Sequence, residues 1–284
     1  MRKTLVKKTL KTIFLSLKDA VFPLKCLACQ ELFLRQTAHC EMDLAPGKGL
    51  YAHHTSLYLC EHCRRDFQGI ESPICLRCGL MFKERFSGDH LCGDCLTKPG
   101  KISFARALGV YDRSLKYLIH ALKYRGKIQV SRALSRLLYA LYCQCYTNET
   151  MECEGPDIIL PVPLFKKRFR QRGFNQAWLL IKDWPLFLAC RSGNEKTECI
   201  KDGLVRNRWT DPQAGLDRKK RQSNIKGAFS LSSHLDVRKK HVLLIDDVYT
   251  TGATVEECAA VLMKNGARKV DVLTVSRTSE KGVA

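Results

Sequence analysis

The chain has 284 residues, of which 45% are hydrophobic, so it is long enough and apolar enough to bury a sizeable core. No stretch approaches the roughly eighteen uninterrupted apolar residues that a membrane span needs, so we expect no transmembrane segment. The 48 Lys and Arg residues against 28 Asp and Glu give a formal charge of +20, which favours polyanionic partners: nucleic acid, phosphorylated small molecules or an anionic membrane surface.

Residues 1–22 combine basic side chains with apolar positions at helical spacing. We expect a basic amphipathic helix there, which ends before Pro23. This helix either packs on its own protein or faces a membrane surface or DNA. Lys11 and Lys18 interrupt any apolar signal-peptide core, and no small-residue cleavage site follows.

Four Cys-x-x-Cys pairs lie between residues 23 and 100, and the chain has 15 cysteines in all. Two pairs supply the four thiolates of a closed tetrahedral site, which is typical of structural zinc. Their order suggests that the first two pairs form one site and the last two another, although a pairing of the first with the third stays open. The predicted ligands are Cys26, Cys29, Cys60, Cys63, Cys75, Cys78, Cys92 and Cys95. The other cysteines are interpreted as free thiols in a reducing cytoplasm.

Pro99-Gly100 marks the predicted end of the cysteine-rich segment, and the character of the chain changes after it. The patterns predict strands over residues 102–112, 157–163, 241–246 and 269–278, and helices over 114–146, 174–190 and 254–267. Consecutive strand, helix and strand indicate a right-handed parallel crossover in an α/β domain. We therefore expect an N-terminal helix (1–22), a double zinc-ribbon module (23–100) and an α/β domain (101–284).

The segment HVLLIDDVYTTGATVEE, residues 241–257, carries the strongest chemical signal. Asp246 and Asp247 end a buried strand, where ligands bind in open α/β sheets. Residues 250–254 form a tight turn that opens a helix, and the backbone N–H groups of such a turn cradle an anion. Carboxylates for a sugar diol beside a phosphate cradle describe ribose 5-phosphate. The chain has neither a Walker loop nor a dinucleotide fingerprint.

The stretch LLIDDVYTTGAT resembles the phosphoribosyl pyrophosphate motif of type I phosphoribosyltransferases. The resemblance implies that fold, a parallel sheet flanked by helices. It also implies that Asp246 and Asp247 are the catalytic acids that hold the ribose hydroxyls. The loop that would hold the 5-phosphate comprises Val248, Thr250, Thr251, Gly252, Ala253 and Thr254.

The stretches LKYRGK (122–127), PVPLFKKRFRQRGFNQA (161–177) and RNRWTDPQAGLDRKKRQSNIKGAF (206–229), behind the cysteine pairs, narrow the resemblance. Together they resemble the competence protein ComF family, whose members join a zinc-ribbon segment to a phosphoribosyltransferase domain. The main departure is a long insertion between Cys29 and Cys60. The resemblance implies that the ligand is phosphoribosyl pyrophosphate with Mg²⁺. It also implies eight candidate residues for the pyrophosphate side of the site: Lys123, Arg125, Pro161, Val162, Pro163, Arg172, Arg206 and Arg208. Each charged residue among them could instead be a solvated surface charge.

Two basic stretches with neighbouring aromatic residues suit contacts to single-stranded nucleic acid. They comprise Lys166, Lys167, Arg168 and Arg170 in an expected loop, and Arg218, Lys219, Lys220 and Arg221 in an expected hood over the site. Two hypotheses follow. In the first, the protein binds phosphoribosyl pyrophosphate and single-stranded DNA and acts in DNA uptake or recombination, with proteins of that process as partners. In the second, it is an active transferase that moves ribose 5-phosphate to an unidentified base or amine.

Overall fold

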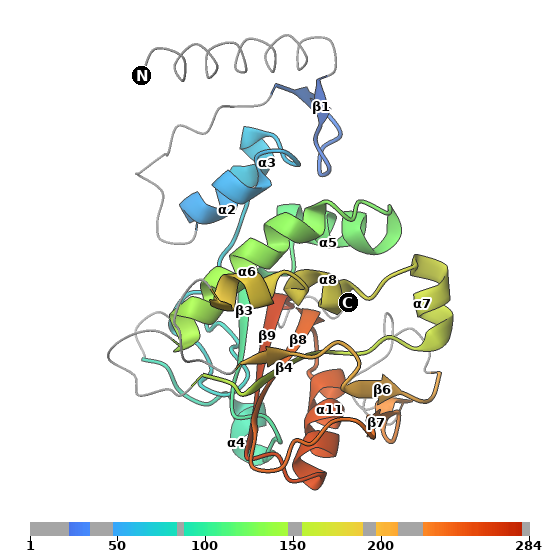
Figure 1. The fold of residues 1–284 in the computed structure, drawn as a ribbon. Helices are drawn as coiled ribbons and strands as arrows, with labels where there is room; N and C mark the ends of the chain where they lie inside the picture. Colours follow the sequence, from blue (N-terminus) through green and yellow to red (C-terminus); the bar gives the residue numbers. More distant parts are fainter. Residues whose placement is uncertain are drawn as a thin grey trace, which may run out of the picture.

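The computed structural model describes residues 23–34, 48–83, 88–146, 155–189, 197–209 and 224–279 (Figure 1). The helix predicted over residues 1–22 lies outside these ranges, and so do the basic residues 218–221. Among the helices that the structure describes, none has the length and apolar character needed to span a bilayer.

The elements follow in chain order. The cysteine-rich segment contains β1 (Leu24–Lys25), β2 (Leu32–Phe33), α2 (Lys48–Thr55), α3 (Glu61–Arg65) and α4 (Gly93–Thr97). The rest contains β3 (Ala105–Val110), α5 (Arg113–Tyr124), α6 (Val130–Tyr146), β4 (Ile158–Pro161), α7 (Lys166–Arg172), α8 (Gln176–Ile181), α9 (Trp184–Ala189), β5 (Glu198–Cys199), β6 (Leu204–Arg206), β7 (Phe229–Leu231), β8 (His241–Tyr249), α11 (Ala253–Lys264) and β9 (Lys269–Arg277).

Five strands form one parallel sheet in the order β3, β9, β8, β4, β5. The two longest strands, β8 and β9, are neighbours near its centre, and almost all of their side chains are buried. Their continuous apolar sequences suit this position, because helices cover both faces of the sheet. The predicted α/β class with a parallel sheet flanked by helices is confirmed. Since every strand runs in the same direction, the carboxyl ends of β8 and β4 meet at one edge.

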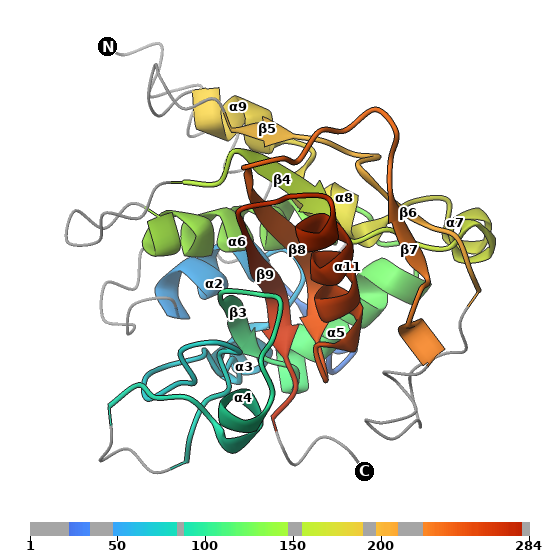
Figure 2. The same cartoon turned by 90° about the horizontal axis from the view of Figure 1, so that it is seen from below.

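The side chains of β8 alternate between the two faces, as the pleat of a strand requires. Leu243 and Ile245 belong to the hydrophobic cluster under α6 and α8, whereas Val242 and Leu244 belong to the cluster under α11. Figures 1 and 2 show α6 and α8 on one side of the sheet and α11 on the other. The sheet is therefore the middle layer of three.

The cysteine-rich segment packs on both sides of this α/β unit. Its first half shares the α6 cluster, where the rings of Tyr51 and Phe67 stack at 3.9 Å and the Tyr51 hydroxyl lies 2.9 Å from the Ser114 hydroxyl of α5. Its second half joins the α11 cluster, and the backbone N–H of Ala105 donates to the carbonyl of Arg77 at 2.6 Å. The described parts share cores, so the boundary at residues 99–100 stays a prediction.

The structure differs from the predicted pattern at several places. The stretch predicted as a basic loop forms the helix α7, because Lys, Arg and Gln favour helix and Gly173, at φ +77°, closes it in the left-handed conformation. Part of the insertion between Cys29 and Cys60 forms α2. The polar region 201–229 contributes the antiparallel pair β6–β7, which its weak periodicity did not predict.

Candidate functional site

The acid pair lies in the C-terminal half of β8, which continues to Tyr249. Consecutive side chains of a strand point to opposite faces, so the two carboxylates face different helices. Asp247 is 5% exposed and forms an ion pair with the ammonium group of Lys123, which comes from the last turn of α5. Asp246 lies on the other side, within electrostatic reach of Arg206 and Cys258. Its Oδ1 accepts the backbone N–H of Asp247 at 2.8 Å.

The surroundings push the pKa values of the two carboxyls apart. Burial raises the pKa of Asp246 well above its usual range, and the negative charge of Asp247 raises it further. Burial also opposes ionisation of Asp247, but the Lys123 ammonium outweighs it and lowers the pKa of Asp247. The same attraction raises the pKa of Lys123 against the effect of burial. The surroundings therefore favour the protonated form of Asp246 and the ionised form of Asp247.

The loop after β8 has the geometry of a phosphate cradle. Gly252 has φ +79°, a conformation that a residue with a Cβ rarely adopts. The loop leads directly into α11, a helix of 12 residues, and the N–H of Ala253 donates to the Thr251 hydroxyl at 3.4 Å. The first N–H groups of a helix have no partners within it, and the helix dipole favours negative charge there. The loop and the helix start together suit a phosphate group.

Lys123, Asp246, Asp247 and the loop open onto one cleft of about 190 Å³. The other lining residues are Tyr124, Val162, Pro163, Leu164, Arg168, Arg172, Gln176, Arg206, Val248, Tyr249, Thr250, Gly252, Ala253, Thr254 and Val255. The wall of the cleft thus combines the two acids and the loop at the start of α11 with three arginines. Such a cleft suits a sugar with phosphate groups at both ends.

The three arginines of the cleft, Arg168, Arg172 and Arg206, differ in their surroundings. Arg172 donates to the Gln176 side chain at 3.0 Å, and its guanidinium carbon lies 5.1 Å from the ring centre of Tyr124. Arg206 is only 7% exposed, and burial, together with the charge of Arg168, lowers the pKa of its guanidinium. Burial likewise lowers the pKa of Arg168. An anion in the cleft would relieve this crowding of positive charge.

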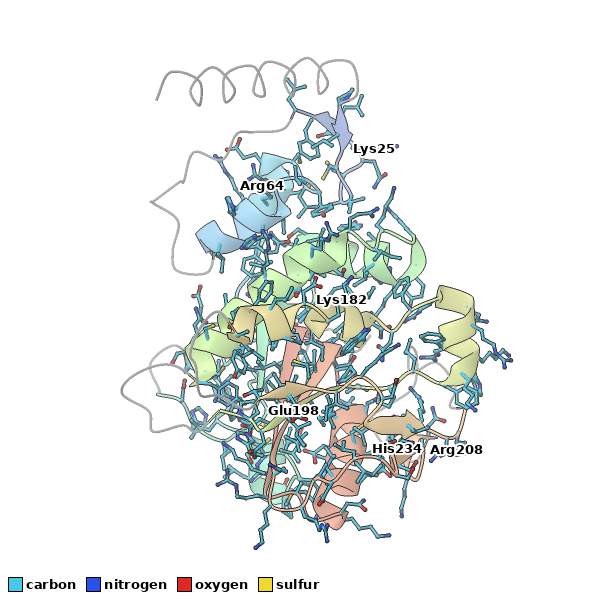
Figure 3. The ribbon with its side chains drawn as sticks, viewed as in Figure 1. Lys25, Arg64, Lys182, Glu198, Arg208 and His234 are labelled. Carbon is cyan, nitrogen blue, oxygen red and sulfur yellow. The ribbon has the colours of Figure 1, made fainter. Side chains whose placement is uncertain are left out.

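The structure places the predicted pyrophosphate residues in two groups. Lys123, Val162, Pro163, Arg172 and Arg206 line the cleft. Three others do not line it within the described part of the chain: Pro161 is buried in β4, Arg125 is exposed, and Arg208 is exposed beside the β6–β7 hairpin (Figure 3). Arg208 instead donates to the carbonyls of Asn224 and Lys226, at 3.0 and 2.9 Å.

Of the predicted nucleic-acid residues, four lie on α7. Lys166, Lys167 and Arg170 are exposed, whereas Arg168 turns into the cleft. The charged groups of Lys167 and Arg168 lie 5.0 and 5.4 Å from the ring centre of Trp209. The helix therefore joins a basic outer face to the cleft wall. The candidates Arg218, Lys219, Lys220 and Arg221 lie outside the described residues.

The eight paired cysteines form two tetrads, and in each the four sulfur atoms lie within 4.8 Å of one another. The first contains Cys26, Cys29, Cys60 and Cys63, and the second contains Cys75, Cys78, Cys92 and Cys95. The structure thus shows the sequential pairing. Cys29 and Cys60, and likewise Cys78 and Cys92, have sulfur atoms 3.7 Å apart. A tetrahedral ion with Zn–S bonds of about 2.3 Å requires a sulfur separation of about 3.8 Å.

Backbone N–H groups point at one sulfur of each tetrad, as in metal knuckles. Cys75 Sγ accepts from the N–H groups of Cys92 and Cys78 at 3.3 and 3.5 Å. Burial opposes ionisation of the Cys75 thiol, but these backbone hydrogen bonds outweigh it and lower its pKa to about 6. Cys26 accepts from Cys60 N–H at 3.4 Å, and such bonds outweigh burial there too, lowering its pKa to about 7. Both donor sets fit structural zinc.

Some cleft residues were not singled out from the sequence. Tyr124 lies in the stretch LKYRGK and Tyr249 lies in the segment 241–257, but neither pattern predicts a role for its tyrosine. Both line the cleft, yet an aromatic residue has no sequence pattern that separates a binding role from core packing. Arg168, a predicted nucleic-acid residue, also lines the cleft.

Of the predicted loop residues, Thr251 does not line this cleft. It lines a neighbouring cavity of about 360 Å³ between the loop and the second tetrad.

Solved structures that match part of this chain include a phosphoribosyltransferase and an amidotransferase. A purine phosphoribosyltransferase from Pyrococcus horikoshii is 18% identical with a TM-score of 0.27, and the match covers 55% of this chain and 85% of that one. A glutamine phosphoribosylpyrophosphate amidotransferase from Bacillus subtilis is 18% identical with a TM-score of 0.30 over 51% of this chain and 26% of that one. The family described as a double zinc ribbon domain matches residues 51–96. With the parallel sheet and the two tetrads, that match confirms the predicted fold class.

Sequence relatives cover most of the chain. The DNA utilization protein YhgH of Escherichia coli is 36% identical over 240 residues, which are 84% of this chain and 95% of that protein. Competence protein F of Haemophilus influenzae is 32% identical over 220 residues, 77% of this chain and 90% of that protein. Competence protein ComFC of Bacillus subtilis is 24% identical over 272 residues, 91% and 97% of the two chains. The chain therefore belongs to the family of YhgH and competence protein F.

Proposed function

We propose that this protein binds phosphoribosyl pyrophosphate with Mg²⁺ in the cleft beside β8, and that it acts in DNA uptake or utilisation with a contact to single-stranded DNA. One observation carries the ligand proposal: the acid pair, the phosphate loop and arginines from both α7 and β6 line the same cleft. The names of the relatives, DNA utilization protein and competence protein, support the cellular role.

The ligand fits the cleft in one orientation. The 5-phosphate accepts hydrogen bonds from the N–H groups of the loop that contains Gly252, at the start of α11. The ribose hydroxyls donate to Asp247, which Lys123 holds in place, and bond to Asp246. The pyrophosphate then lies toward the arginines of α7 and β6. Mg²⁺, for which carboxylate and phosphate oxygens are suitable ligands, would offset the charge of the pyrophosphate there.

Calorimetric titration of the zinc-loaded protein with phosphoribosyl pyrophosphate and Mg²⁺ tests this site. We expect binding by the wild type and its loss in the Asp246→Asn/Asp247→Asn variant, which keeps the shape of both side chains. Asp202→Asn is the matched control, because Asp202 is exposed and does not line the cleft. If the folded wild type gives no heat of binding, or if the double variant binds as tightly as the control, the ligand proposal is wrong.

The outer face of α7 is the proposed DNA contact. It exposes Lys166, Lys167 and Arg170, and Phe169, at 42% exposure, offers a ring on which a base can stack. We expect a fluorescent oligothymidylate to bind more weakly to a Lys166→Ala/Lys167→Ala variant, with a shallower dependence on salt because fewer phosphates are neutralised.

The matched control for this experiment is Lys239→Ala/Lys240→Ala. This variant removes the same charge from exposed lysines that precede β8, at the opposite end of the strand from the acid pair. Equal weakening by the two variants would mean that net charge alone, and not the α7 face, determines binding.

The asymmetry of the acid pair also favours a second candidate, an active transferase. Neighbouring carboxyls whose surroundings shift their pKa values in opposite directions are common in catalytic sites. In that reaction a nitrogen nucleophile bonds to C1 of the ribose as the bond from C1 to the pyrophosphate oxygen breaks, and the arginines stabilise the departing charge. Release of pyrophosphate in a screen of bases and amines, lost in Asp247→Asn, would establish it. Absence of release by a protein that binds the ligand would leave a binding role.

A further inference from the structure

We infer that the second cysteine tetrad positions the phosphate loop, and that Arg277 is the positioning residue that connects them. This inference rests on the proposed function in so far as the loop is a phosphate site. Arg277 is the last residue of β9 and is 8% exposed. One of its amino groups donates to the carbonyl of Cys78 at 2.6 Å, and the other donates to the Cys78 sulfur at 3.4 Å. It therefore contacts a predicted metal ligand directly.

The plane of the Arg277 guanidinium lies over the ring of Tyr249, with 4.5 Å between the central guanidinium carbon and the ring centre. Tyr249 and Arg277 are paired residues at the ends of β8 and β9, so their backbones are fixed relative to each other. The Tyr249 ring in turn lies under Gly252, where an added Cβ would come within 2.7 Å of Cζ. A continuous chain of contacts thus leads from Cys78 through Arg277 and Tyr249 to the phosphate loop.

A second route connects the same tetrad to the helix that carries the loop. Glu256, in the first turn of α11, accepts the backbone N–H of Lys101 at 2.7 Å. Gly100 approaches the same carboxylate so closely that a Cβ there would lie 2.7 Å from Oε1. Arg77, between two cysteines of the tetrad, donates to the carbonyls of Cys95 and Lys98 at 2.7 and 3.0 Å. The segment that leaves the last cysteine is therefore attached to α11.

Through these contacts, the position of the phosphate loop depends on the zinc ion of the second tetrad. A zinc-bound Cys78 is a thiolate, and a charge-assisted hydrogen bond fixes the guanidinium beside it. Without the ion, the knuckle that supplies both acceptors for Arg277 loses its cross-link, and the support under Tyr249 weakens. Coupling of this kind is reciprocal, so a ligand in the loop must also strengthen metal retention by the second tetrad. The first tetrad packs in the other hydrophobic cluster, the one under α6 and α8.

Hydrogen exchange without any ligand tests the coupling independently of the proposed function. We expect the amides of residues 250–256 to exchange at least about tenfold faster in zinc-loaded Arg277→Met than in the wild type, a factor that corresponds to about 1.4 kcal/mol. Arg106→Met is the matched control. Arg106 also donates to the backbone beside the second tetrad, at the Leu76 carbonyl, but its guanidinium lies over Phe104 and not over Tyr249. Equal exchange in the two variants, at equal zinc content, would overturn the inference.

Zinc release to a chromophoric chelator tests the reciprocal effect. In Cys29→Ser, which leaves the second tetrad intact, we expect phosphoribosyl pyrophosphate with Mg²⁺ to slow release severalfold, and Arg277→Met in that background to abolish the slowing. Arg277→Lys keeps the charge but not the planar contacts, so it should behave like Arg277→Met; full rescue by lysine would contradict a positioning role. If the ligand does not bind at all but the loop still exchanges faster in Arg277→Met, the proposed function fails and the coupling stands.

Discussion

Substitution of Gly252 by alanine separates two demands that the structure makes on the phosphate loop. The first is the backbone, because φ of +79° places a residue with a Cβ in the left-handed region at a cost of about 1–2 kcal/mol. The second is space, because the Cβ would meet the Tyr249 ring, with Cζ at 2.7 Å, and moving that buried ring costs about 1–3 kcal/mol. Gly252→Ala should therefore lower the free energy of unfolding by about 2–5 kcal/mol.

Gly227→Ala provides the control that isolates the contact with Tyr249. Gly227 also has a positive φ, +69°, but no atom lies within 4 Å of its added Cβ. Gly227→Ala should lower the free energy of unfolding by only about 1–2 kcal/mol. In urea unfolding of the zinc-loaded proteins, Gly252→Ala should therefore be less stable than Gly227→Ala by about 1–3 kcal/mol. Gly252→Ala should also weaken phosphoribosyl pyrophosphate at least about tenfold, whereas Gly227→Ala should not. Equal stability and equal affinity of the two variants would refute the packing of the loop on Tyr249.

Three further predictions concern the acid pair and the tetrads. Lys123→Met should destabilise the protein by about 3–5 kcal/mol, because it leaves a buried charge on Asp247, and Asp247→Asn in the same chain should restore much of the loss in urea unfolding. The raised pKa of Asp246 means that, between the usual carboxyl pKa and the raised one, the folded state holds a proton that the unfolded state releases. The free energy of unfolding should therefore fall as the pH rises through this range, and Asp246→Asn should flatten the slope. An unchanged slope in the variant would assign the pH dependence to another group. Cys95→Ser should leave one zinc ion per chain by elemental analysis, and two ions in this variant would show that the second tetrad does not hold the metal.

Much of the architecture could be predicted because it depends on local patterns. The apolar runs of β8 and β9 are buried on both faces, and such runs are typical of central parallel strands. The Cys-x-x-Cys spacing fixes two sulfurs on one knuckle, so the order along the chain was enough to suggest the tetrads. The acid pair and the loop are contiguous in sequence, which is why their juxtaposition could be predicted from one short segment.

The remaining features depend on contacts between distant segments. Lys123 and Asp247 meet only because α5 packs beside the end of β8, and no local pattern records this. In the sequence, Arg277 is an ordinary charged residue at the end of a strand. Its contacts with Cys78 and Tyr249 form only where the cysteine-rich segment packs on the sheet. Arg208 has the same spacing from Arg206 as two residues on one face of a strand, but β6 ends at Arg206, so the strand does not direct Arg208 toward the cleft. Arg208 lies outside the cleft, where it is bonded to backbone carbonyls.

The central claim is that the cleft beside β8 is a live site for phosphoribosyl pyrophosphate, and a crystal structure of the zinc-loaded protein with this ligand and Mg²⁺ tests it most directly. The account predicts the 5-phosphate against the backbone N–H groups of residues 250–254, the ribose hydroxyls at Asp246 and Asp247, and the pyrophosphate toward Arg172 and Arg206. A ligand bound elsewhere, for example on the outer face of α7, or an empty cleft at saturating ligand, would contradict the account.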